Sequence, residues 1–380
     1  MNYHRIGSEE NGSVSIFSVV FFIIIISILT ISFVRIVNIE QQQAIDNSSS
    51  ASALAAARSG IEDGKRVLLH LKNLPDADPL KITVLSGSAG CSTIYSSSDL
   101  QTKLGLQPDG RVFTSNATGD GQYVTCLTVA NDTATFESQT SPGNSVIVPL
   151  RAAGAAPISS VRVAWHRSST DGQITATGPA SVSNPSLSEL GDRPSYLRLQ
   201  LIAVPRTNIT RDAIQSKTAF LAVNVQSTLT TDIVMGLDTL DDDANEANPK
   251  LGPQIIGCDK DQVPYACGTV VLGNPSGSQF DASLDYYLRV TAIHKKTSFQ
   301  VSMKDALGND VLFDNVQPSI DSTGKTGNTF RRLKARVSYT SNVDIPEYVA
   351  EAFGSDPGTG DICKNMKISG TVITGSTCGW

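Results

Sequence analysis

The sequence contains few of the residues on which metal and acid–base sites depend. Among its 380 residues are only four histidines, and no two of them have the spacing of a zinc site. No G-x-S-x-G motif, the setting of a catalytic serine in many hydrolases, is present. We therefore expect no enzymatic activity and no cofactor. The histidines are His4, His70, His166 and His294.

The chain also lacks an excess of positive charge. Its formal net charge is −6, and its lysines and arginines are scattered rather than gathered into one stripe. A protein that binds nucleic acid through phosphates usually carries a basic patch or a basic overall charge. We therefore expect no nucleic-acid partner.

Long apolar runs are absent except for one. Residues 16–34 include no Asp, Glu, Lys, Arg or His, and nineteen helical residues span about 28 Å, close to the thickness of a bilayer core. A secretory signal has a shorter apolar core followed closely by a small-residue cleavage site, but the Ala51-Ser52-Ala53 candidate lies well beyond Arg35. The sequence predicts a single-pass membrane protein with an extracytoplasmic body.

No proline interrupts the chain between the apolar run and Pro75. We therefore expect one helix over residues 13–74, with a membrane part at 16–34 and a docking part at 41–74. Within the docking part, six residues recur at helical spacing and predict a buried stripe. These stripe residues are Leu54, Ala57, Ile61, Gly64, Leu68 and Leu71.

The opposite side of this helix is charged. It carries Arg58, Lys65 and Lys72, and we expect Glu62 to pair with Arg66 one turn later. Such a pair contributes only a few tenths of a kcal/mol. A helix of about 60 residues is much longer than the average of about 11 in globular proteins, so packing of the stripe must supply most of its stability.

From about residue 80 onward, short apolar runs alternate with turn residues, a pattern typical of strands. The clearest expected hairpin joins 286–294 to 297–303. The loop DDDANEANPKLGP is either a boundary between β-rich regions at 80–240 and 255–380 or a long insertion in one domain. The fold class is α+β, with a long N-terminal helix and a large β-rich head. The expected strands are 111–114, 122–129, 145–151, 161–165, 196–204, 219–225, 269–272, 286–294, 297–303, 330–339 and 366–373.

Six cysteines form three pairs of sequence neighbours. Six cysteines allow fifteen connectivities, and the sequence does not select one of them. Because disulfides persist outside the cytoplasm, an exported head favours bonded cysteines over free thiols. Our preferred pairing is Cys91 with Cys126, Cys258 with Cys267 and Cys363 with Cys378.

Three short motifs resemble binding or catalytic sites only in part. Gly324-Lys325-Thr326 matches the end of a phosphate-binding loop, but Ser319 replaces the required glycine, which favours a flexible turn. Ser322-x-x-Lys325 is a short match of the kind that chance produces in a serine-rich chain.

An acidic loop has the alternate spacing of the first ligands of a calcium loop, but it lacks the glycine turn and the glutamate at the twelfth position. We favour a solvated acidic loop and expect no metal at Asp241, Asp243 and Asn245.

The N-terminus resembles type IV pilin-like proteins, specifically the PilX-type minor pilins. A polar leader, residues 1–12, ends in Gly12 and is followed by Ser13, the apolar run and the helical ALAAARSGIEDGKR; the closing DICKNMKISGTVITGSTCGW is similar to the cysteine-closed loop of many pilins. The resemblance implies cleavage after Gly12 by a prepilin peptidase and a helix that rests in membrane lipid before it packs with other pilins or pseudopilins.

The sequence departs from most pilins at Phe17, where the family usually carries a glutamate. In the family that glutamate pairs with the amino terminus of a neighbouring subunit. Its absence suggests a subunit at the filament tip, acting in assembly initiation or adhesion. The same absence suits a single-pass surface adhesin that never enters a filament. The surface ligand stays unknown in either case.

Overall fold

The computed structural model describes residues 13–85, 90–112, 121–154, 157–179, 190–209, 213–226, 233–236, 241–242, 254–272, 280–337, 367–368 and 371–372. The chain divides into two units, residues 1–339 and 340–380. In the second unit the described residues form two short antiparallel strands, β17 (Lys367–Ile368) and β18 (Thr371–Val372), in the range where one longer strand is expected. Gly12, Cys363 and Cys378 lie outside the described residues.

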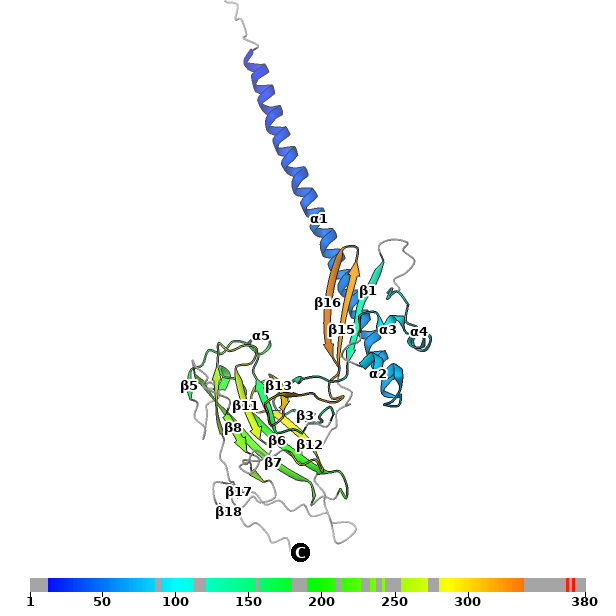
Figure 1. Cartoon of the computed structure of the whole chain (residues 1–380). Helices are drawn as coiled ribbons and strands as arrows, with labels where there is room; N and C mark the ends of the chain where they lie inside the picture. Colours follow the sequence, from blue (N-terminus) through cyan, green and yellow to red (C-terminus); the bar gives the residue numbers. More distant parts are fainter. Residues whose placement is uncertain are drawn as a thin grey trace, which may run out of the picture. The chain divides into compact units, whose positions relative to one another are not determined.

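The first unit begins with one unbroken helix, α1 (Ser13–Lys72), of 60 residues (Figure 1). The predicted long N-terminal helix is confirmed. The helix ends in two tight turns in which the Asn73 and Leu74 amides donate to the carbonyls three residues earlier, and Pro75 follows. His70 and Lys72 in the last turn face the negative end of the helix dipole.

Three short helices follow, where strands were expected from about residue 80. They are α2 (Pro79–Leu85), α3 (Thr93–Ser96) and α4 (Ser98–Leu104). The side chains of Asp78 and Ser97 accept backbone N–H bonds at the starts of α2 and α4. Gly105, with φ of +66°, ends α4 in the left-handed conformation. The range 80–240, expected to be β-rich with its first strand at 111–114, therefore begins with short helices.

A three-stranded antiparallel sheet, ordered β1-β15-β16, packs against the C-terminal half of α1 (Figure 1). Its strands are β1 (Gln122–Ala130), β15 (Ser319–Thr326) and β16 (Thr329–Arg336). The Gly324-Lys325-Thr326 segment, expected to be a turn, is instead the end of β15. Two inward-facing positions of β15 are small, Ser322 and Gly324, so the strand reads as polar even though its inner face is buried.

The remaining described strands of the first unit form a thirteen-stranded sheet, with the main order β14-β13-β4-β11-β10-β7-β6-β12-β3. Strands that precede β9 in the sequence and strands that follow it are neighbours in this sheet, so the two expected β-rich ranges share one sheet. Its side chains form one hydrophobic core around Trp165, Phe299 and Phe313. The strands are β2 (Thr135–Thr140), β3 (Ser145–Pro149), β4 (Ser160–Trp165), β5 (Gly178–Pro179), β6 (Leu197–Pro205), β7 (Gln215–Gln226), β8 (Ile233–Gly236), β9 (Asp241–Asp242), β10 (Gln254–Asp259), β11 (Cys267–Leu272), β12 (Leu284–Ala292), β13 (Thr297–Lys304) and β14 (Asp310–Val311).

The expected hairpin of β12 with β13 is wrong. β12 pairs on its two edges with β6 and β3, whereas β13 pairs with β4 on one edge and with β2 and β14 on the other. Both edges of each strand are therefore occupied by other partners. The Ile293 amide donates to the Tyr196 carbonyl, which directs the connection away from a hairpin turn. Proximity in sequence favoured the hairpin, but long-range pairing of the buried strands determines the topology.

Two disulfides link described residues. Cys91–Cys126 joins the segment before α3 to β1, and Cys258–Cys267 joins register neighbours of β10 and β11. Both are pairs that the sequence favoured. The first closes a loop of 35 residues and holds α3 against the small sheet, whereas the second closes only a loop of nine.

Candidate functional site

The N-terminal half of α1 is an exposed apolar surface. Every residue from 16 to 34 is exposed, with Phe17 at 81% of its full accessible surface. By length and composition, α1 is a candidate for a single membrane span. Two of its hydroxyls suit lipid, because Ser27 and Thr30 donate to the carbonyls of Ile23 and Ile26 at 2.7 and 2.8 Å. This half of the helix therefore resembles a segment that is covered by lipid or by other apolar helices.

The C-terminal half of α1 is covered by the head. Five of the six stripe residues are buried and Leu54 is half-buried. Three of them, Ile61, Leu68 and Leu71, belong to a hydrophobic cluster that also includes residues of α2, α3, α4, β1 and β15. Within this one continuous helix, the N-terminal half is apolar and uncovered, whereas the C-terminal half packs against the head.

Glycines bring the helix and the small sheet unusually close together. A Cβ atom added to Gly324 of β15 would lie 2.1 Å from the Ala53 carbonyl oxygen and 2.4 Å from the Ala57 amide nitrogen. A Cβ at Gly60 would lie 2.1 Å from Ser322 Oγ, and one at Gly64 would lie 2.5 Å from Ile320 Cγ2. Because real Cβ contacts are longer than 3 Å, a Cβ at Gly324 would clash with the helix backbone, whereas one at Gly60 or Gly64 would force neighbouring side chains to move.

Sequence reasoning found Ala57 and Gly64 but missed Gly60 and Gly324. The signal for Gly60 is present, since Ala53, Ala57, Gly60 and Gly64 repeat at spacings of four, three and four. Small residues at that spacing permit close approach of a helix backbone. Gly324 gives no comparable signal, because a glycine in a polar stretch is more often part of a turn.

The exposed side of the docked half forms ion pairs other than the expected one. Glu62 pairs with Lys65 at 2.7 Å, and Arg66 pairs with Asp63. The expected Glu62 to Arg66 pair is therefore not formed. Asp63 also accepts a hydrogen bond from the Tyr95 hydroxyl at 3.0 Å, and burial raises the pKa of Tyr95. Asp63 thus connects α1 to α3 and also pairs with Arg66.

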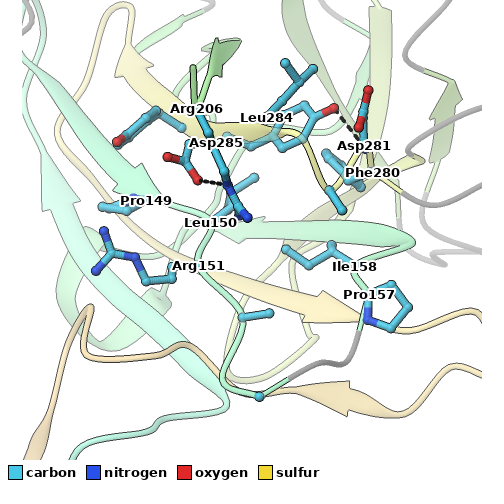
Figure 2. A pocket seen from close by; sticks show the side chains of 15 residues that line it. Pro149, Leu150, Arg151, Pro157, Ile158, Arg206, Phe280, Asp281, Leu284 and Asp285 are labelled. Atoms are coloured by element: carbon cyan, nitrogen blue, oxygen red, sulfur yellow. Dashed lines mark hydrogen bonds and ion pairs between the residues drawn. The ribbon is translucent and has the colours of Figure 1, made fainter. Parts of the chain in front are cut away.

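A pocket of about 500 Å³ lies in the large sheet, where the starts of β12 and β4 meet the ends of β3 and β6 (Figure 2). In Figure 2 the Arg206 side chain reaches over the middle of the pocket, and Arg151 stands at its edge. Arg206 Nε donates to Asp285 Oδ1 at 2.9 Å. The lining residues are Pro149, Leu150, Arg151, Ala152, Gly154, Pro157, Ile158, Arg206, Phe280, Asp281, Ala282, Leu284, Asp285, Tyr286 and Tyr287.

The same pocket has an ordered aromatic and acidic wall. The rings of Phe280 and Tyr286 meet edge to face with centroids 4.8 Å apart, and the Tyr286 hydroxyl accepts a bond from the Asp281 amide. Bonds from the Ser283 amide and hydroxyl, both 2.8 Å, lower the pKa of the Asp281 carboxyl. Sequence reasoning missed this pocket because its residues come from segments far apart in the chain and match no motif.

The weak motif residues are separated by the fold. Ser322 is buried and faces Gly60, whereas Lys325 lies on the other face of β15 with its amine over the Phe330 ring. Asp241 pairs in register with Thr218 of β7, and Asp243 and Asn245 lie outside the described residues. Within the described ranges, no three His, Cys, Asp or Glu side chains gather in a metal-binding group.

Comparisons with protein-family models, with curated proteins and with solved structures found no match for this chain.

Proposed function

We propose that this chain is a minor pilin or pseudopilin-like structural subunit of a type IV filament or a related machine. The observation that carries the proposal is the division of α1. Its first half is uncovered and apolar, and its second half is docked on an antiparallel sheet by glycine contacts. A subunit held in lipid and later transferred to a bundle of apolar helices needs this arrangement.

Burial of its apolar side chains favours an apolar environment around the N-terminal half of α1, both in lipid and in a helix bundle. Each large apolar side chain left in water forgoes roughly 1.5 to 3 kcal/mol of burial, and the exposed ones here include Phe21, Phe22 and Ile23. The docked half has its own core, so the head does not need to refold when the first half moves from lipid to a helix bundle. Cleavage after Gly12 by a prepilin peptidase would free Ser13 as the new terminus.

Phe17 supports a position at the tip of such a filament. A carboxylate in lipid is costly unless another group neutralises it, so a subunit that docks beneath no predecessor has no use for one. A subunit that acts in initiation or adhesion at the tip can also carry a large head, because the head is not repeated along the shaft. In this proposal the surface partners are other pilins or pseudopilins, and the body lies outside the cytoplasm.

A single-pass adhesin that never joins a filament is the alternative, and Phe17 with the large head favours it equally. Quantification of the chain in sheared filaments separates the two roles. A subunit is enriched in the sheared fraction and is lost from it when the major filament protein is deleted. An adhesin stays entirely in the detergent-extracted membrane fraction, and that result would overturn the filament proposal.

A further inference from the structure

The pocket of Figure 2 offers hydrogen-bond donors that the protein itself does not use. The Arg206 side chain is 60% exposed and is oriented by one contact, since its Nε donates to Asp285, while its backbone amide donates to the Ser283 carbonyl. Among the described residues, the two terminal nitrogens of Arg206 have no acceptor. The Arg151 guanidinium likewise has no acceptor in the described part of the chain. A guanidinium held by one carboxylate can present its other edge to a second acceptor.

The pocket also offers free acceptors. Asp281 uses Oδ1 for both bonds from Ser283, and Asp285 uses Oδ1 for Arg206. Within the described residues, Oδ2 of each carboxylate has no donor. Asp281 and Asp285 are exposed, and an ionised carboxylate only accepts hydrogen bonds, so hydroxyl or N–H groups of a ligand can replace water at these two oxygens.

An apolar surface lies beneath these polar groups. Pro149, Leu150, Ile158 and Phe280 are buried and line the pocket. The cavity of about 500 Å³ falls in the range of sites for small molecules, which combine an apolar lining with a few placed polar groups. The ligand therefore needs an apolar face as well as donors and one anionic acceptor.

We propose that this pocket binds an acidic sugar, a pyranose that carries one carboxylate. The carboxylate accepts from Arg206, with Arg151 adding positive charge at the edge. The hydroxyl groups donate to the free oxygens of Asp281 and Asp285, and the C–H face of the ring packs on the apolar lining. A phosphate fits less well, because its second negative charge would lie near two carboxylates. An aliphatic or aromatic acid without hydroxyls would form no hydrogen bond with either carboxylate oxygen and would gain less from the site.

The test is a titration of the full-length chain in detergent micelles, followed by saturation-transfer NMR of the added compound. Three acidic sugars are used as probes: glucuronate, galacturonate and N-acetylneuraminate. Glucose, hippurate and inorganic phosphate serve as the comparison compounds. We expect saturable binding of at least one acidic sugar, weaker binding of glucose, and none of hippurate or phosphate.

Two variants test the assigned contacts. Arg206→Gln removes the main donor, and we expect it to weaken binding of the acidic sugar at least about tenfold while leaving the weak glucose signal unchanged. Arg151→Gln, at the exposed edge, is expected to weaken binding by a smaller factor. Arg111→Gln, a surface arginine outside the pocket, is the matched control and leaves binding unchanged.

Several results would overturn the proposal. These are no saturable binding of any of the three acidic sugars, tighter binding of phosphate or hippurate than of the sugars, or equal affinity in Arg206→Gln and the unchanged chain. Because the titration measures ligand binding at the pocket and not incorporation into a filament, it fails independently of the filament assay. The ligand assignment stands for a subunit and for an adhesin alike.

Discussion

Substitution of Gly324 by alanine tests the packing of the helix on the small sheet. The new Cβ would lie 2.1 Å from the Ala53 carbonyl oxygen and 2.4 Å from the Ala57 amide nitrogen. Both atoms belong to the helix backbone, so no side-chain rotation relieves the contact. The sheet and the helix must separate to accommodate the methyl group.

The size of the effect follows from how much shorter the new contact would be than an ordinary van der Waals contact. An ordinary contact begins at 3.4 Å, so the deficit is 3.4 − 2.1, or 1.3 Å. Overpacking of a core typically costs about 1 to 3 kcal/mol, and a clash between two backbones belongs at the upper end. We expect a loss of about 2 to 3 kcal/mol in the free energy of undocking.

Hydrogen exchange followed by mass spectrometry measures this loss locally. Amides in residues 53–71 of Gly324→Ala should exchange about 30 to 150 times faster than in the unchanged chain, since each 1.36 kcal/mol is a factor of ten. Amides of β6 in the large sheet should not change. Gly191→Ala is the matched control, because nothing lies within 4 Å of its added Cβ and its φ is ordinary. An exchange rate in Gly324→Ala equal to that of Gly191→Ala would refute the packing argument.

Three further predictions concern other parts of the chain. Replacing Cys91 and Cys126 together with serine should destabilise the small sheet by about 4 kcal/mol on the chain-entropy estimate for a loop of 35 residues, measured by urea unfolding under oxidising conditions; a loss below 1 kcal/mol would contradict it. Hydrogen bonds from Ser298, Arg167 and Thr170 lower the pKa of Asp171 in spite of its burial, so its stabilising contribution is full above the unfolded pKa of about 3.9 and is lost as the pH falls through the folded value. The Tm difference between the unchanged chain and Asp171→Asn should therefore shrink as the pH is lowered below about 4, and a constant difference from pH 7 to 3 would refute this. A lysine in place of Ile25 costs about 2.5 to 3.5 kcal/mol at the centre of a membrane helix and should release the protein on alkaline extraction, whereas Ile45→Lys, beyond the apolar run, should not; equal extraction of both would contradict the span.

The long helix was predictable because its signals are local. The uncharged run over residues 16–34, the absence of proline before Pro75 and the repeat of small and apolar residues all lie within one segment. Most of the longer strands of the large sheet were also predictable, because apolar residues are dense or alternate along them, but β2 and β10 were missed. The two disulfides between described residues were predictable as well, because each joins cysteines that are neighbours in the order of cysteines along the chain.

The pairing of strands and the pocket were not predictable from local signals. β15 was missed because Ser322 and Gly324, which face α1, make a buried strand look polar. β12 and β13 were joined in a hairpin because the sequence does not reveal that both edges of each strand are already paired. The pocket depends on that same topology, which brings Arg206 to Asp285 across 79 residues.

The mass of the mature N-terminus tests the central proposal most directly. The chain is expressed in cells with an active prepilin peptidase, and the N-terminal peptide is identified by mass spectrometry. The account predicts a chain that begins at Ser13, with Met1 to Gly12 removed. The same cells without the peptidase should retain the full leader. A chain that still begins at Met1 when the peptidase is active would contradict the proposal.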